Sequence, residues 1–585
     1  MKTKILDLVF LTLFCAITFF ALARFRPLAN PDEGRYVEIP TEMVASGDYI
    51  TPTLNGMPYF YKPPLFYWLQ AASIKTFGSN IFAWRFANSA VAIFGVLLTY
   101  LATSLLYNRR AGIFAGLVLA TCNLYYALGQ VIVLDTTVSV FIAGALFSFM
   151  LFYFKDKFKP LYILAFFVFS ALAVLTKGLI GVLIPCAVVF LFLLFCNPVK
   201  FVKNITKGEF LALFLGVVLF LAIVLPWHIL AAIATPAKEG ASFFSKDPIG
   251  QGFLWYYIMH EHFLRYLDSS TSMRYQPFWF FFVFAPVGLL PWLPAFIQSL
   301  FYEFKGGIAN FVKNNKKTLF LLVYVAFVLL FFSVSKSKLI PYIISIYPAL
   351  AVIVGVFFDK VLRGSVKRPK ASLWAVVALG FLAAIALPVV CHVVNAKGRM
   401  YMPEISWYVF SAASLAVLVP TIAGTAFLLK NNIKAALYTA FAGAGIFTLC
   451  FNPVAAHLQR PSSADFAKCI LSDKNYSGAK IVLYRNYNEF QDMPVYTKRY
   501  VYLVNTPPDE QLFGYNLKAG ENAKRFLTEN DFKKLVESGE ALWIVSRNRD
   551  LDDLNLKGDG VKLAAKNHQS SLFFCKRPLK IKKSD

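Results

Sequence analysis

The sequence predicts a polytopic α-helical membrane protein with about 13 transmembrane helices and a small α/β domain at its C-terminal end. Of its 585 residues, 58% are hydrophobic and only 15% are charged, whereas a soluble protein carries about a quarter charged residues. The apolar residues occur in many runs of about 18 or more, the length that crosses the hydrocarbon core of a bilayer. The charged residues collect in the short segments between these runs.

The predicted spans follow one another along the chain with short polar connections. They cover residues 5–24, 81–105, 112–130, 132–153, 161–177, 179–196, 209–231, 277–301, 318–334, 339–358, 371–393, 405–429 and 434–451. The connections near residues 130 and 178 are very short, so the divisions between spans at these two points have the least support in the sequence. The first run also has the features of a signal peptide, with "ALA" at 21–23 as a cleavage site, but its length and the later spans favour a retained helix.

The position of the basic residues predicts the orientation of the chain. The formal net charge is +26, and most of the Lys and Arg lie in alternate short loops, as cytoplasmic loops require. These loops are residues 108–110, 155–159, 197–209, 305–317, 359–370 and 430–434. The N-terminus is therefore predicted to be cytoplasmic and the C-terminus to lie outside. Because the charge orients the chain in this way, and no basic soluble domain occurs, nucleic acid is not expected as a partner.

Three outer segments are too long to be simple connections. The first long loop (25–80) and the second long loop (232–276, the fourth outer connection) contain residues 36–46 and 252–267, whose apolar residues have helical spacing and predict helices in the membrane interface. Residues 455–585 contain no span. Short β-type runs at 480–484, 500–504, 541–545 and 571–575 alternate with polar, helix-compatible segments, which predicts a periplasmic α/β domain.

Unusual polar residues gather at the predicted outer face. Ionisable residues at membrane depth are costly and are candidates for function, although each alone could cap a helix or pair with a lipid headgroup. "SKSK" at 335–338 places two lysines on the side where the charge rule expects none, which favours anion binding. The candidates are Asp32, Arg35, Tyr36, Tyr59, Lys62, Asp135, Lys177, His262, Arg265, Lys336, Lys338 and Tyr342.

This set of residue types fits transfer of a phosphate-linked group. Cationic and tyrosyl side chains can hold a phosphate by charge-assisted hydrogen bonds. A carboxylate can act as a base or stabilise positive charge on a sugar ring. No Walker loop or dinucleotide fingerprint stands in the required context. A lipid-phosphate-linked donor therefore fits better than a nucleotide.

Several motifs in the first 360 residues carry a family resemblance. The segment "NPDEGRYVEIPTEMVASGDYITPTLNGMPYFYKPPLFYWL" (30–69) strongly resembles the first periplasmic loop of the bacterial aminoarabinose lipid A transferases. These belong with the polyprenyl-phosphate-dependent, dolichyl-phosphate-mannose-protein mannosyltransferase-like glycosyltransferases. "VLDTTVSVF" (133–141), "LTKGLIG" (175–181), "HEHFLRY" (260–266) and "SKSKLIPYIISIYPAL" (335–350) resemble further segments in the same order. The resemblance implies a C-type glycosyltransferase fold. The predicted spans place the transmembrane glycosyltransferase domain over residues 1–452 and the periplasmic domain over 455–585.

The resemblance also implies roles for individual residues. Asp32 would be the main catalytic carboxylate and Asp135 a second acid in the cavity. The donor phosphate would be bound by Arg35, Tyr36, Tyr59, Lys62, Lys177, His262, Arg265, Lys336, Lys338 and Tyr342. His262 matches a residue that can bind zinc in the aminoarabinose enzymes, but the family's glutamate before Lys62 is here Tyr61, a poor zinc ligand. No cofactor is therefore expected to be required, and zinc or another divalent cation near His262 is the one candidate.

The predicted function is transfer of a sugar from a polyprenyl (undecaprenyl) phosphate to lipid A or another lipopolysaccharide glycan, with inversion, at the outer face of the bacterial inner membrane. An alternative in the same family is a protein O-mannosyltransferase-like enzyme that acts on Ser or Thr. A transporter for a lipid-linked sugar is less favoured, because transporters place charged sites near the midplane of related halves and this sequence shows no internal repeat.

Overall fold

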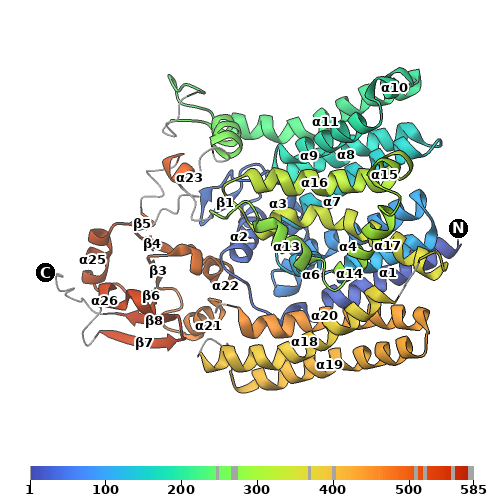
Figure 1. Cartoon of the computed structure of the whole chain (residues 1–585). Coiled ribbons are helices and arrows are strands. Elements are labelled where there is room, and N and C mark those ends of the chain that lie inside the picture. The colour runs from blue at the N-terminus through green and yellow to red at the C-terminus, as the bar shows by residue number, and fades with distance from the viewer. Residues whose placement is uncertain are drawn as a thin grey trace.

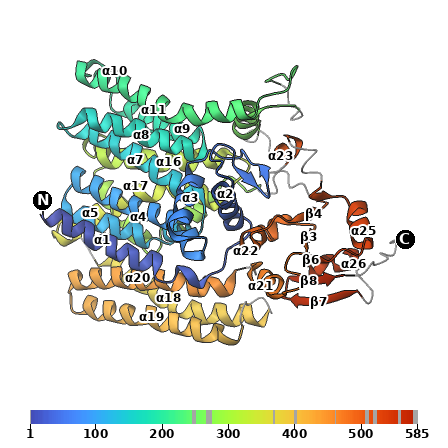
Figure 2. The same ribbon diagram turned by 180° about the vertical axis from the view of Figure 1, so that it is seen from behind.

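The computed structural model contains a bundle of long helices with a sheet domain at one end (Figure 1). It describes residues 2–244, 250–264, 275–366, 370–397, 403–459, 462–505, 512–517, 524–554 and 560–576. The view from behind shows the same two parts, the helical bundle and the sheet domain, with the first long loop between them (Figure 2).

Ten helices of the described chain are long and apolar enough to cross a membrane. They are α1 (Lys2–Phe20, continued by η1, Ala23–Phe25), α4 (Ile81–Leu106), α7 (Leu134–Phe154), α8 (Lys159–Lys177), α11 (Lys207–Ala234), α16 (Lys316–Val334), η3 with α17 (Ile340–Ile346 and Tyr347–Leu362), α18 (Ala371–Ala396), α19 (Pro403–Leu429) and α20 (Ile433–Leu458). The chain is therefore a multi-pass membrane protein, as predicted.

Two predicted spans are bent. α5 (Arg109–Thr121) and α6 (Asn123–Gln130) meet at 60°, and α13 (Phe280–Gly288) and α14 (Leu293–Glu303) meet at 104°. Counting each pair as one span gives up to 12 in the described chain. α9 (Ile180–Phe195) is apolar but shorter. The count of 13 stays a prediction, and the breaks near residues 130 and 178 lie where the sequence placed them.

The bundle is built around α7. This helix is apolar on every face, and 89% of its most apolar 18-residue window is buried in the protein, which is the pattern of a central helix. Gly355 of α17 packs so closely on α5 that an added Cβ would lie 2.5 Å from the backbone nitrogen of Ala115.

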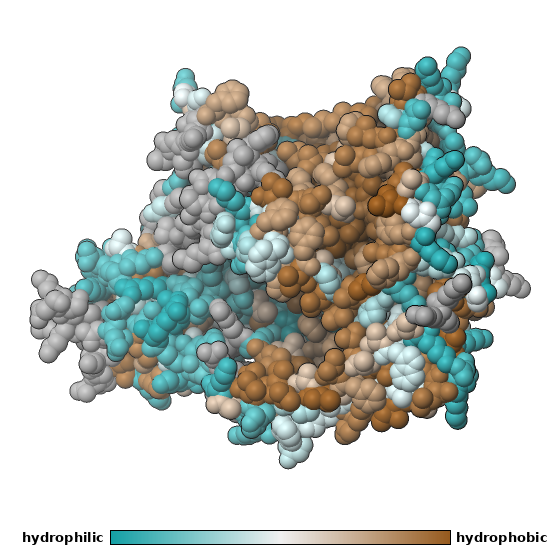
Figure 3. All heavy atoms as spheres, viewed as in Figure 1, coloured by the Kyte–Doolittle hydropathy of each residue, from teal (hydrophilic) through white to brown (hydrophobic). Residues whose placement is uncertain are grey.

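The surface of the bundle is a broad apolar belt with hydrophilic residues at both ends (Figure 3). The short helices α10 (Pro198–Lys203) and α15 (Ile308–Asn314) lie at the end that holds the N-terminus, opposite the sheet domain (Figure 1). Two of the predicted basic loops therefore share one side of the bundle.

The two long loops are folded segments. The first contains α2 (Asp32–Ser46), the hairpin β1 (Thr53–Leu54) and β2 (Met57–Pro58), and α3 (Leu65–Phe77). The second contains η2 (Trp255–Leu264), a π-helix. Helices thus occur where residues 36–46 and 252–267 predicted them.

The C-terminal domain is a mixed six-stranded sheet in the order β5-β4-β3-β6-β8-β7. The first four strands are parallel, and β8 and β7 are antiparallel to their neighbours. The strands are β3 (Lys480–Tyr484), β4 (Tyr502–Val504), β5 (Phe526–Leu527), β6 (Leu542–Arg547), β7 (Val561–Lys566) and β8 (Ser570–Cys575). The helical segments are α21 (Ala464–Ser472), η4 (Tyr487–Glu489), α22 (Met493–Thr497), α23 (Leu512–Leu517), α25 (Glu529–Glu537), η5 (Asn548–Asp550) and α26 (Leu551–Leu554). All four predicted β runs form strands; β5 and β7 were not predicted.

Alternate residues of β3 point to two different cores. Val482 and Tyr484 pack on the face covered by α25. Ile481 and Leu483 face the other side, in a cluster that continues without a break into α2, α3 and η2. The sheet domain is therefore packed directly on the first long loop.

Candidate active site

A cavity of about 210 Å³ opens where the first long loop meets the bundle. Its walls come from α2, the segment after β2, the starts of α7 and α9, the end of α8, η2, the end of α16 and η3. It is lined by Asp32, Arg35, Tyr36, Tyr59, Tyr61, Lys62, Val133, Leu134, Asp135, Lys177, Ile180, Glu261, Phe331, Phe332, Ser335, Ser337, Leu339, Pro341 and Tyr342.

α2 supplies the first part of this lining. Asp32 is its first residue, and Arg35 and Tyr36 follow three and four positions later, so all three share one helix face. Burial, together with the charge of Asp32, raises the pKa of Tyr36 well above its ordinary value. The Tyr36 hydroxyl therefore stays protonated and can donate a hydrogen bond into the cavity.

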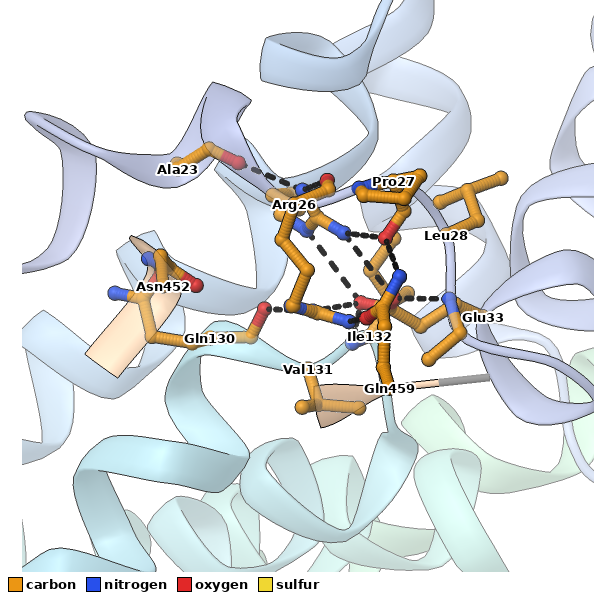
Figure 4. Close-up of polar contacts among 12 residues, drawn as sticks. Ala23, Arg26, Pro27, Leu28, Glu33, Gln130, Val131, Ile132, Asn452 and Gln459 are labelled. Carbon is orange, nitrogen blue, oxygen red and sulfur yellow. Dashed lines mark hydrogen bonds and ion pairs between the residues drawn. The ribbon is translucent and has the colours of Figure 1, made fainter. Parts of the chain in front are cut away.

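The neighbouring carboxylate, Glu33, points away from the cavity into a buried ion cluster (Figure 4). Its oxygens accept two bonds from Arg26, both 2.7 Å, and one of 3.1 Å from Arg85. The backbone N–H groups of Ala29 and Ile132 donate to it at 2.7 and 3.0 Å. Glu33 thus ties the start of α2 to α4 and to the chain before α7.

The charge balance inside this cluster favours the ionised carboxylate. Burial raises the pKa of Glu33, but the guanidinium groups of Arg26 and Arg85 outweigh burial and lower the pKa to about 2. Glu33 is therefore a fixed structural anion. Of the two adjacent acids, only Asp32 lines the cavity.

The cations of the cavity are each held by a neighbour. Lys62 pairs with Glu261 at 3.1 Å. Lys177 pairs with Asp135 and lies 4.6 Å from the ring centre of Tyr342. These contacts fix the ammonium groups at the cavity wall, where they can receive an anion without first being ordered.

Arg35 is held from the C-terminal domain. Its Nε donates to Oε1 of Gln491 at 3.2 Å, and its Nη1 donates to the Tyr59 hydroxyl at 3.1 Å. Gln491 is itself oriented by its bond to Asn488, 3.0 Å long. The position of one cavity cation therefore depends on residues more than 450 positions away in the chain.

The structure brings most of the predicted residues together. Eight of the twelve candidates line the cavity: Asp32, Arg35, Tyr36, Tyr59, Lys62, Asp135, Lys177 and Tyr342. Arg265 and the side chain of His262 lie outside the part of the chain that the structure describes.

The "SKSK" lysines do not line the cavity. Lys338 is buried and donates to the carbonyl oxygens of Gln276, at 2.9 Å, and of Ser335. Lys336 is exposed. Their neighbours Ser335 and Ser337 reach the cavity in their place. Lys338 thus ties the turn before η3 to the chain at Gln276 through two backbone carbonyl groups.

Glu261 is a cavity residue that the sequence did not single out. It lies between two histidines in "HEH", and the pairing with Lys62 across nearly 200 positions cannot be read from spacing. The aromatic side chain of Tyr61 stacks on Tyr59 with ring centres 5.2 Å apart. A carboxylate therefore does occur beside Lys62, but it comes from η2 and not from position 61.

The predicted metal site rests on His262, whose side chain lies outside the described residues, so a divalent cation there stays a prediction. His260 lies 3.3 Å from Glu261, and that carboxylate is paired with the ammonium group of Lys62. An ammonium group at this position competes with a divalent cation for the same oxygens. In the described chain, no three His, Cys, Asp or Glu side chains converge as metal ligands.

Comparisons with known proteins agree with this architecture. Residues 5–239 match the family "Dolichyl-phosphate-mannose-protein mannosyltransferase". An undecaprenyl phosphate-alpha-4-amino-4-deoxy-L-arabinose arabinosyl transferase of Aeromonas salmonicida is 29% identical over 371 residues, 62% of this chain and 63% of its own. The chain thus matches less than two thirds of that relative's length.

Two solved structures are similar over most of the chain. ArnT from Cupriavidus metallidurans bound to undecaprenyl phosphate is 23% identical, covers 97% of both chains and gives a TM-score of 0.76. The archaeal oligosaccharyltransferase AglB from Archaeoglobus fulgidus is 13% identical, covers 94% of this chain and 70% of its own, and gives a TM-score of 0.51. These likenesses confirm the predicted fold class, and the matches to the mannosyltransferase family and to the arabinosyl transferase agree with the predicted family resemblance.

Proposed function

We propose that this chain is an integral membrane glycosyltransferase that moves a sugar from a polyprenyl-phosphate donor to lipid A or another lipopolysaccharide glycan. One observation carries the proposal. A single cavity joins a carboxylate, Asp32, to three fixed cations, Arg35, Lys62 and Lys177, at one end of a membrane-spanning bundle. The similarity to arabinosyl transferases that are named for an undecaprenyl phosphate-linked aminoarabinose supports this choice of donor.

In the proposed reaction, an oxygen of the acceptor forms a bond to the anomeric carbon of the sugar. The bond from that carbon to the phosphate oxygen breaks, and its electron pair leaves with the polyprenyl phosphate. Negative charge grows on this phosphate as it departs, and the three cations stabilise it. The displacement is in line and inverts the anomeric centre.

The role of Asp32 depends on the acceptor group. A phosphate of lipid A is already ionised at neutral pH, so Asp32 then stabilises positive charge on the sugar ring. A hydroxyl acceptor must lose a proton, and Asp32 then receives it. Asp135, paired with Lys177, keeps that cation in place and is the second acid of the cavity.

The orientation and location follow from charge. Helices from two of the basic loops lie at the N-terminal end of the bundle, and the cavity and the sheet domain lie at the other (Figure 1). By the bias of cytoplasmic loops toward Lys and Arg, the N-terminus is cytoplasmic and residues 455–585 are periplasmic. The protein would then act at the outer face of the bacterial inner membrane.

A second candidate is a protein O-mannosyltransferase-like enzyme with a Ser or Thr acceptor. The family match over residues 5–239 favours it, because the name of that family describes transfer of mannose from dolichyl phosphate, which is also a polyprenyl-phosphate-linked donor, to protein. Mass spectrometry of lipid A and of periplasmic glycoproteins from a deletion strain separates the two acceptors.

The test of the main proposal is the Asp32→Asn variant with defined polyprenyl-phosphate sugars and lipid A. We expect transfer to fall at least about 100-fold, the usual effect of removing a group that acts in the transition state. Asp48→Asn is the matched control, because Asp48 is an exposed acid of the same loop. Turnover near that of the unaltered enzyme would refute the role given to Asp32.

A further inference from the structure

A second cavity, of about 130 Å³, lies between the C-terminal domain and the start of α2. Asn30 and Pro31 form part of its wall, and the next residue, Asp32, lines the first cavity. Adjacent residues are only about 3.8 Å apart along the backbone. Residues 30–32 therefore form a wall that the two cavities approach from either side.

The lining of this second cavity is rich in amides. Asn486, Asn488, Asn567 and Gln569 contribute to it, together with the rings of Phe466 and Phe490. A side-chain amide carries both donor and acceptor atoms, as does each hydroxyl of a sugar. The buried phenylalanine rings supply an apolar surface suited to the C–H face of a pyranose ring.

Some of these amides are already committed to the protein. Asn567 Oδ1 accepts the backbone N–H groups of Gln569 and Ser570 at 2.9 and 2.8 Å, which shapes the β7–β8 turn. The side-chain amides of Asn486 and Gln569, in contrast, form no hydrogen bond with any described residue, and both side chains are partly buried. They are the groups available to a ligand.

The charge of the cavity argues against an anionic ligand. No Lys or Arg lines it, and its single charged lining residue is the acid Glu489. The guanidinium group of Arg547, which does not line the cavity, lies 3.8 Å from that carboxylate. A phosphate would meet a negative wall here, unlike in the first cavity.

We infer that this amide-lined cavity binds a neutral pyranose unit of the acceptor glycan. It would hold a sugar next to the one that reacts, and so set which glycan presents its acceptor group to Asp32. Its volume of about 130 Å³ is roughly that of ten waters, since one water needs roughly 10–15 Å³ of cavity volume, so the cavity is far larger than a site for a single water. This inference rests on the proposed function, which supplies a glycan acceptor.

The test measures saccharide binding directly. Full-length protein in nanodiscs is titrated with the methyl β-glycoside of N-acetylglucosamine and with the β-1,6-linked N-acetylglucosamine disaccharide, both neutral, followed by saturation-transfer NMR. The test variant is Asn486→Gly combined with Gln569→Ala, where glycine keeps the left-handed backbone of residue 486 (φ 61°). The control is Asn475→Ala, an exposed amide of the same domain.

We expect the control to bind like the unaltered protein and the double variant to bind at least about tenfold more weakly, with equal thermal stability. In transfer assays, the KM for the acceptor should rise by a similar factor, with kcat and the KM for the donor unchanged. Inorganic phosphate should not displace the saccharide. Equal binding by the double variant, or displacement by phosphate, would overturn the inference.

The inference and the proposed function fail in different ways. If neither saccharide binds while transfer to lipid A still depends on Asp32, the function stands and the sugar site is wrong. If the saccharides bind at the amide cavity but no donor supports transfer, the sugar site stands and the proposed reaction is wrong.

Discussion

Replacing Glu33 by Gln should destabilise the protein far more than replacing an exposed acid. Glu33 is fully buried and is the only carboxylate that meets both Arg26 and Arg85 in the described structure. Gln offers one acceptor oxygen in place of two, and its NH₂ group would face N–H donors. Two guanidinium groups would remain buried without an anion.

Two separate arguments give the loss of folding free energy expected for Glu33→Gln. Removing one partner of a buried ion pair costs about 3–5 kcal/mol. The fall of the Glu33 pKa from 4.5 to about 2 corresponds to about 3 kcal/mol of interaction that favours the charged form. The two values agree in order of magnitude, so we expect a loss of about 3–5 kcal/mol.

The assay is thermal unfolding of the purified protein in nanodiscs at pH 7 and one fixed scan rate, since large membrane proteins often unfold irreversibly. The control is Glu540→Gln, which removes the exposed pair between Lys480 and Glu540 and should cost at most about 1 kcal/mol. Asp32→Asn provides the opposite pattern, with activity lost and Tm kept. Equal Tm values for Glu33→Gln and Glu540→Gln would refute the structural role of Glu33.

Three further predictions concern pH, the C-terminal domain and helix packing. The folded-state pKa of Glu33, about 2, lies below its ordinary value of 4.5. The contribution of Glu33 to the stability of the protein is therefore complete above about pH 4.5 and is lost as the pH falls toward 2. Between pH 7 and pH 3, Tm should drop less in Glu33→Gln than in the unaltered protein. Gln491→Ala removes the acceptor for Arg35 Nε, so donor KM should rise severalfold; an unchanged KM would contradict the positioning role. Gly355→Leu should abolish folded yield, judged by size-exclusion chromatography, because its Cβ would meet the backbone of α5 at 2.5 Å, whereas Gly208→Ala, with open space around it, should express normally.

Much of the fold could be predicted because its signals are local. Each span is a continuous apolar run, so its position depends only on residues next to one another. The strands at 480–484 and 571–575 could be found in the same way. The sharp bends within 109–130 and 280–303 could not be predicted, because the two halves of each bent span pack against helices that are distant in sequence.

The site was predicted in composition but not in its pairing. The resemblance in the first long loop and the restriction to one membrane face found Asp32, Arg35, Lys62 and Lys177. They could not show that Glu261, from the second long loop, forms an ion pair with Lys62. They also could not show that the Lys338 ammonium group donates hydrogen bonds to two backbone carbonyl groups. Those outcomes depend on which side chains meet across hundreds of residues.

The adjacent acids of "PDEGRY" separate the two kinds of information most clearly. The sequence by itself determined that a charged pair follows the first span, just before the helix predicted over residues 36–46; the structure begins that helix at Asp32. Only the tertiary structure decided that Glu33 is locked between Arg26 and Arg85 while Asp32 faces the cavity. The physical reason is that consecutive helix residues point about 100° apart, so the packing around α2 buries one carboxylate among cations and leaves the other facing the cavity.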